Sequence, residues 1–178
     1  MKVLIAYTSK HGTSARCAEM LGEKLMGCCE VDIVDLHKQS ALDINDYDVA
    51  VLGGSVRFAS VSKTLKRFLK QHAEKLQAKD CAIFLCCGYP DNFEDYVKEN
   101  IPKQLTPSLG FHCFGGELKP KQVKGIDKLL IRAMRNAIVE HDFEESFYEG
   151  SLPDILPESI ERLADRICGK NGYPPSQA

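Results

Sequence analysis

The feature that most constrains the fold of this chain is the alternation of continuous apolar runs with helical segments. The runs that predict strands are Lys2–Tyr7, Cys29–Asp35, Tyr47–Gly53, Asp80–Cys87 and Gly110–Gly115. The segments that predict helices are Ser14–Met26, Lys63–Leu76, Asn92–Gln104, Ile126–Ile138 and Pro157–Cys168. Because strands that are apolar throughout need cover on both faces, the pattern predicts an α/β fold whose parallel sheet lies between helices.

The chain is interpreted as one domain. At 178 residues it can bury a substantial core, and no linker divides it. We expect a single domain over residues 1–168 and a flexible, glycine- and proline-containing tail at 169–178. Residues 118–151 form an elaboration before the last helix, in which basic and apolar residues are interleaved. This pattern favours an amphipathic helix packed on the domain. The alternative is a contact with anionic lipid, quinone or an acidic partner.

Charge and cysteine usage exclude several classes of protein. A net charge of −2 argues against nucleic-acid binding, and no apolar stretch is long enough to span a bilayer. The brief apolar start, Met1–Ile5, runs straight into a turn, so we interpret it as a core strand and expect a cytoplasmic protein. Eight cysteines without C-x-x-C spacing predict free, mostly buried thiols in a reducing compartment and no metal site.

The first predicted strand is followed by a turn rich in hydroxyl groups. Its residues are Ser9, Lys10, His11, Gly12, Thr13 and Ser14. The backbone N–H groups and the dipole of the helix that starts here favour an anion. Three hydroxyls with a glycine among them exceed what a simple helix cap needs. We therefore expect a phosphate monoester to bind here, with Lys10 and His11 contributing backbone N–H groups.

Two further loops follow the third and fourth predicted strands, and each carries glycine and an aromatic residue. Their candidate binding residues are Gly54, Ser55, Val56, Arg57 and Phe58, and then Cys87, Gly88 and Tyr89. Ligands of open α/β sheets bind beyond the carboxyl ends of the strands, and glycine lets the backbone approach them closely. One phosphate site and two loops able to sandwich a flat ring predict a mononucleotide or a flavin phosphate.

The first turn resembles the N-terminal signature of the flavodoxin family. The matching residues are Tyr7, Ser9, Gly12 and Ala18. Ala6 and Ser14 depart from the signature, but Ser14 keeps the hydroxyl that the usual threonine would supply. The strand before and the helix after are the context that the motif requires. The resemblance implies a flavodoxin-like, doubly wound sheet of five parallel strands in the order 2-1-3-4-5, with FMN as a non-covalent cofactor that transfers electrons.

Nearly the whole chain is similar to the menaquinone-dependent protoporphyrinogen dehydrogenase branch of that family. The loop Gly54–Phe58 resembles the Gly-x-Ser-Ile-Arg-Tyr loop of the branch, and Phe114–Leu118 also resembles a segment of it. Where the branch has a long basic insertion, Gly88–Leu109 is shorter and contains acidic residues. The resemblance implies a redox partner protein or a quinone as partner. Protoporphyrinogen oxidation is the alternative function, and a homodimer and a peripheral membrane contact stay open.

Individual roles within the loops have alternatives. Arg57 is expected either beside a flavin ring, where it would stabilise an anionic reduced form, or in substrate recognition. Either Phe58 or Tyr89 can flank the ring. Cys86 and Cys87 end a buried strand with no base nearby, so they are interpreted as packing residues. The sequence offers no convincing set of catalytic acids and bases.

Competing classes lack the residues that they require. A receiver module needs acidic residues after the first and third strands. A cysteine-dependent phosphatase needs an arginine that ends the cysteine loop, and a dinucleotide oxidoreductase needs G-x-G-x-x-G after the first strand. None of these is present. A non-enzymatic module that binds a phosphate-bearing ligand is the distant alternative.

Overall fold

The computed structural model describes residues 1–39, 41–116, 154–170 and 172. Its described part contains a parallel five-stranded sheet in the order β2-β1-β3-β4-β5. The strands are β1 Lys2–Thr8, β2 Glu30–Asp35, β3 Val49–Ser55, β4 Asp80–Cys86 and β5 Gly110–Cys113. The order and the parallel pairing confirm the doubly wound α/β sheet that the sequence predicts.

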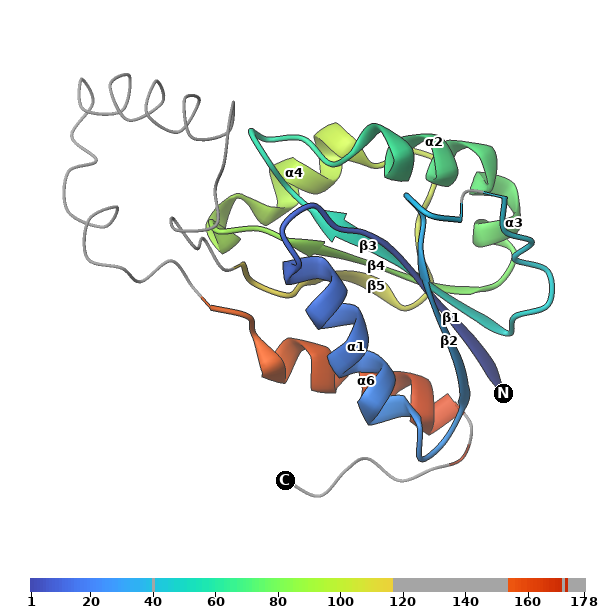
Figure 1. The fold of residues 1–178 in the computed structure, drawn as a ribbon. Coiled ribbons are helices and arrows are strands. Elements are labelled where there is room, and N and C mark those ends of the chain that lie inside the picture. Colours follow the sequence, from blue (N-terminus) through green and yellow to red (C-terminus); the bar gives the residue numbers. More distant parts are fainter. Residues whose placement is uncertain (40, 117–153, 171, 173–178) are drawn as a thin grey trace, which may run out of the picture.

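Helices cover both faces of the sheet (Figure 1). The helices are α1 Thr13–Leu25, α2 Lys63–Gln71, α3 Ala73–Gln77, the 3₁₀ turn η1 Pro90–Asn92, α4 Phe93–Asn100 and α6 Pro157–Lys170. Helices α1 and α6 lie on one face, and α2, α3 and α4 lie on the other. Successive side chains of a strand point to opposite faces. Accordingly, Val3 and Ile5 of β1 join the core under α1 and α6, whereas Leu4 and Ala6 join the core under α2.

Several predicted boundaries differ from the structure. The predicted helix Lys63–Leu76 is two helices, because His72 leaves the helical conformation with φ −108° and ψ 11°. Helix α6 continues to Lys170, past the predicted end at Cys168, so residues 169 and 170, predicted to belong to the tail, are helical. The elaboration at 118–151, including the predicted helix Ile126–Ile138 and its expected lipid, quinone or partner contact, lies outside the described residues. None of the helices that the structure describes has the length and apolarity needed to cross a membrane.

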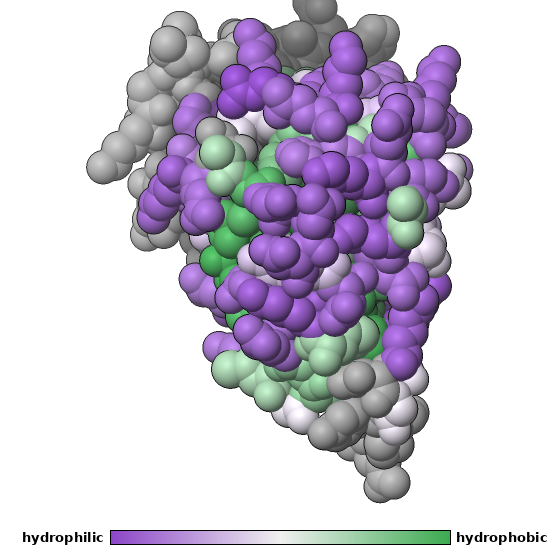
Figure 2. All heavy atoms as spheres, turned by 90° about the vertical axis from the view of Figure 1, so that its right-hand side faces the viewer, coloured by the Kyte–Doolittle hydropathy of each residue, from purple (hydrophilic) through white to green (hydrophobic). Residues whose placement is uncertain are grey.

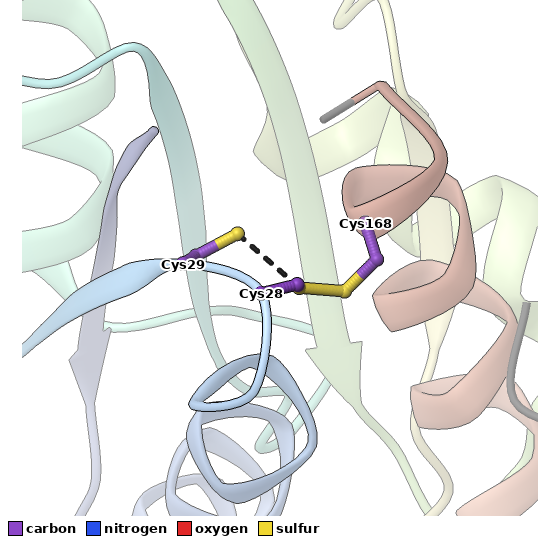
Figure 3. A group of neighbouring side chains, drawn as sticks. All are labelled: Cys28, Cys29 and Cys168. Carbon is purple, nitrogen blue, oxygen red and sulfur yellow. Dashed lines mark hydrogen bonds between the residues drawn. A yellow bond between two sulfur atoms is a disulfide. The ribbon is translucent and has the colours of Figure 1, made fainter. Parts of the chain in front are cut away.

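A disulfide between Cys28 and Cys168 corrects the prediction that every cysteine is free. Figure 3 shows Cys28 in the turn after α1 and Cys168 on α6, with Cys29 beside them. The Cys29 sulfur lies 3.4 Å from that of Cys28. The three sulfurs lie within 4.8 Å of one another, but two of them are already bonded together. Sequence reasoning missed the pair because 140 residues separate its members. The bond joins the turn after α1 to α6, on the face of the sheet that these two helices cover.

Candidate functional site

The carboxyl ends of β1, β3 and β4 form one edge of the sheet because these neighbouring strands are parallel. The chain leaves β1 toward β2 on one side while β3 lies on the other side, so this edge holds the topological switch point. Hydrogen bonds join the loops that emerge here. The Val56 N–H donates to the Cys86 carbonyl at 2.8 Å, and the Ser62 hydroxyl donates to Thr8 Oγ1 at 3.0 Å.

The opposite edge of the sheet, where the strands begin, is rich in charged residues. Figure 2 shows that face largely covered by hydrophilic residues. Ion pairs hold it together, among them Lys2 with Asp32 at 3.2 Å and Lys170 with Asp80 at 2.6 Å. The hydrogen bond from Lys170 is the main reason why the pKa of the Asp80 carboxyl is lowered. The two edges therefore offer different chemistry: charge pairs at one, and the loops predicted to bind a ligand at the other.

The turn after β1 depends on Gly12. This residue has a φ of +95°, a conformation that glycine adopts without steric cost, and it caps the start of α1. Its N–H donates to Ser9 Oγ at 3.1 Å, and its carbonyl accepts from the Arg16 N–H at 2.9 Å. The start of α1 has no side-chain cap from the described residues, and Lys10 and His11 of the same turn are exposed.

Ser14 supplies the strongest indication of a ligand. It lies in the first turn of α1 with none of its surface exposed, and its hydroxyl has no hydrogen-bond partner among the described residues. The nearby Cys86 thiol has a pKa well above its usual value, because the hydrogen bond with the Cys17 thiol and burial outweigh a lowering by a contact with the Ser14 hydroxyl. A thiol is a weak hydrogen-bonding group, and the Ser14–Cys86 contact does not have the geometry of a hydrogen bond. Buried polar groups without partners are rare and cost free energy. An anion with oxygen acceptors at this helix start would satisfy the hydroxyl, so the residues present fit a phosphate group.

The loop after β3 is a tight two-residue hairpin at Phe58 and Ala59. Arg57 and Ser60 exchange backbone hydrogen bonds of 2.8 and 3.0 Å. Both turn residues have positive φ values, +49° and +58°, which for residues other than glycine cost about 1–2 kcal/mol each. The Phe58 side chain is 44% exposed, and the Arg57 guanidinium lies 5.8 Å from its ring centre. A strained turn thus presents an aromatic ring beside a positive charge.

Asn100, the last residue of α4, holds this hairpin in place. Its side-chain oxygen accepts from the Val61 N–H at 3.0 Å, and its side-chain nitrogen donates to the Ala59 carbonyl at 2.9 Å and the Tyr96 carbonyl at 2.8 Å. The residue is 5% exposed. Sequence reasoning missed Asn100 because no local pattern distinguishes it from a polar residue at a helix end. It positions the loop and is not itself predicted to contact a ligand.

The loop after β4 carries the second aromatic residue. Tyr89 is 36% exposed and precedes η1, whereas Cys87 is buried. Gly116 lies against this loop so closely that a Cβ there would approach the Cys87 carbonyl carbon to 2.9 Å. The exposed large hydrophobic residues in the described part of the chain are Met26, Ile33, Phe58 and Tyr89. Two of them therefore emerge from loops at the switch-point edge, as a site for a flat ring requires.

The predicted glycine of the second loop has a packing role. Gly54 is buried within β3, and a Cβ there would lie 2.6 Å from Thr8 Oγ1. The close approach that this glycine permits is thus to the neighbouring strand. Ser55 ends β3, and the N–H of Val56 is already bonded to Cys86. Direct contacts of these residues with a ligand stay a prediction, as do those of Ser9, Thr13 and Gly88.

The fold and this edge define a class: open α/β proteins that hold a phosphate-bearing ligand with a flat ring. A family model described as "Flavodoxin domain" matches residues 4–144. The chain therefore belongs to the flavodoxin domain family. It is an FMN-binding, flavodoxin-like redox protein.

The chain is also similar in sequence to individual curated proteins. The chain is 26% identical over 85 residues to protoporphyrinogen IX dehydrogenase [quinone] of Escherichia coli K12, a match covering 47% of each chain. It is 27% identical over 85 residues to the Leishmania major protein of the same name, covering 47% of this chain and 37% of that one. The match thus spans half or less of the length of these curated relatives.

Solved structures support the fold. A Streptococcus pneumonia TIGR4 flavodoxin has a TM-score of 0.56 at 13% identity, covering 96% of this chain and 99% of that one. A flavodoxin from the domain Archaea has a TM-score of 0.53 at 14% identity, covering 97% and 100%. These similarities confirm the flavodoxin-like arrangement of strands and helices.

Proposed function

We propose that FMN binds with its phosphate at the start of α1 and its ring between the loops that carry Phe58 and Tyr89. The single observation that carries this assignment is the buried Ser14 hydroxyl without a partner among the described residues. When bound, FMN supplies one- and two-electron redox chemistry. The residues proposed to hold it are Ser9, Lys10, His11, Gly12, Thr13, Ser14, Gly54, Ser55, Val56, Arg57, Phe58, Cys87, Gly88 and Tyr89.

The chain's own residues divide this task. Ser14, Ser9 and the N–H groups of the first helical turn bind the phosphate. Phe58 and Tyr89 shield the ring faces from water. Arg57, whose guanidinium lies beside Phe58, favours a negative charge on the ring. The main role that follows is electron transfer between a donor and a redox partner protein, without a catalytic acid or base from the protein.

A second candidate function is quinone-dependent protoporphyrinogen IX dehydrogenation. The observation that favours it is the similarity over 85 residues to proteins of that name. The loops at the switch-point edge would then have to admit a porphyrinogen or quinone next to the flavin. In this chain the described segment 88–109 between β4 and β5 contains the acidic residues Asp91, Glu94, Asp95 and Glu99. We therefore place electron transfer first.

One experiment separates the two functions. The FMN-loaded protein is reduced in the absence of oxygen and mixed with menadione, and separately the oxidised protein is mixed with protoporphyrinogen IX. An electron carrier is expected to pass electrons to several acceptors without being reduced by protoporphyrinogen. Rapid reduction by protoporphyrinogen followed by reoxidation with menadione would instead establish the dehydrogenase. The apoprotein, without added FMN, is the control for flavin-independent reaction.

The compartment is also a proposal. We propose that the protein works in the cytoplasm, because six of its cysteines are free in the structure, as is typical of reducing compartments. Disulfides are rare in reducing compartments, so the Cys28–Cys168 bond is then expected to be open in the cell. Acid-quenched alkylation of the protein in intact cells tests this. Two alkylated cysteines at these positions support the cytoplasm, and protected ones contradict it.

A further inference from the structure

Two cysteines meet at the switch-point edge without being joined. Cys113 ends β5, and its register partner on β4 is Leu85, two residues before Cys87. The sulfurs of Cys87 and Cys113 lie 3.5 Å apart, in hydrogen-bonding contact. Both are free cysteines in the structure. Only a small rearrangement separates this dithiol from a bond between the two strand ends.

The two thiols have unequal environments. Cys87 is 2% exposed, whereas Cys113 is partly exposed. The contact with Cys87 and the Gly115 N–H together lower the pKa of Cys113 to about 7, despite partial burial. The same contact and burial raise the pKa of Cys87 far above its usual value. Of the two thiols, Cys113 is therefore the one that ionises first. Its thiolate accepts a hydrogen bond from the Cys87 thiol, and the thiolate is the reactive form of cysteine.

Other cysteines in the described part of the chain do not share this arrangement. Cys17 and Cys86 also lie close, 3.6 Å apart, but both are buried, and the pKa of Cys86 is raised. Burial raises the pKa of Cys81 to about 12 and also raises that of Cys29. Among the described free cysteines, Cys113 combines access from outside, stabilisation of the thiolate and a second thiol within contact distance.

We propose that Cys113 and Cys87 form a peroxide-responsive dithiol at the ligand-binding edge, with Cys113 as the reacting thiolate and Cys87 as the resolving thiol. The Cys113 thiolate attacks one oxygen of a hydroperoxide, the O–O bond breaks, and hydroxide or alkoxide leaves. Cys113 is then a sulfenic acid. The Cys87 thiol attacks its sulfur, an S–S bond forms, and water leaves. The two thiols supply the two electrons that reduce the hydroperoxide.

The consequence of this bond lies in the third loop of the site. Cys87 is at the root of the loop that carries Tyr89, and Gly116 packs on its backbone. Closing the bond would tie this loop to the end of β5. The sequence alone suggested packing and ligand contact for Cys87, and no thiol chemistry. The thiol chemistry does not require FMN, so it can be tested independently of the proposed function.

The test is performed on the full chain as purified, with and without FMN, keeping the Cys28–Cys168 disulfide intact. One equivalent of hydrogen peroxide is expected to remove two hydrogen atoms from the intact mass, and peptide mapping should find the Cys87–Cys113 link. Cys113→Ser should abolish the reaction. Cys87→Ser should stop it at a sulfenic acid on Cys113 that dimedone traps. Cys29→Ser is the matched control and should react as the original protein does.

A second measurement keeps the inference falsifiable if a variant folds poorly. The rate of Cys113 alkylation by iodoacetamide should rise with pH around a midpoint near 7, and Cys87→Ala should move that midpoint upward. Oxidation of Cys29 in preference to Cys113, or absence of a Cys87–Cys113 link, would overturn the proposal. An alkylation midpoint at the ordinary value of a free cysteine, about 8.5, would overturn it as well.

Discussion

Replacing Asn100 with alanine tests whether its side-chain hydrogen bonds stabilise the positive-φ conformation of the Phe58 hairpin. The substitution removes three hydrogen bonds, to the Val61 N–H and to the Ala59 and Tyr96 carbonyls. The Ala59 carbonyl can turn to water because that residue is exposed. The Val61 N–H cannot, since Val61 is 4% exposed. One buried donor left unsatisfied costs about 1–3 kcal/mol, and the other bonds add roughly 1 kcal/mol.

We therefore expect Asn100→Ala to lower the free energy of unfolding by about 2–4 kcal/mol, measured by urea titration. The freed hairpin can also relax its two positive-φ residues, so rebuilding the site on binding should cost about 2 kcal/mol and raise the FMN dissociation constant roughly 30-fold. Asn45→Ala, at an exposed position before β3, is the control and should change neither quantity. Unchanged FMN affinity in a destabilised Asn100→Ala protein would refute the link between Asn100 and the site.

Three further perturbations follow from the structure. Ser14→Ala should raise the FMN dissociation constant about tenfold to a hundredfold, measured by flavin fluorescence, with little change in the stability of the apoprotein, because the buried hydroxyl has only a weak contact with the Cys86 thiol to lose. Reduction of Cys28–Cys168 should lower the free energy of unfolding by about 2–4 kcal/mol, and Cys28→Ser should remove the response to reductant. Burial and Lys75 lower the pKa of His72 below its ordinary 6.5. The neutral form is thus favoured on folding, and stability should decline as the pH falls below about 6.5. A His72→Gln protein with the same decline would contradict that assignment.

The sheet could be predicted from the sequence because its central strands are apolar on both faces, as the buried residues Val3 to Ala6 illustrate. The sequence also predicted the edge of the sheet at which a ligand would bind, since parallel strands bring their carboxyl ends together; ligand binding there stays a prediction. Other features depend on contacts between distant residues, and these have no local signature. The bonds from Asn100 to the hairpin, the Cys28–Cys168 pair and the packing of Gly54 on Thr8 are of this kind. The interruption between α2 and α3 could not be predicted either, because His72 lies at the helical spacing of the neighbouring apolar residues.

The central claim is that the turn at the start of α1 binds the phosphate of FMN. Its most direct test compares the binding of FMN and riboflavin, which share the ring and differ in the phosphate, to the apoprotein and to Ser14→Ala. The account predicts much tighter binding of FMN, and a loss on substitution that is confined to FMN. Equal affinity for the two flavins, or no retention of FMN after desalting, would contradict it.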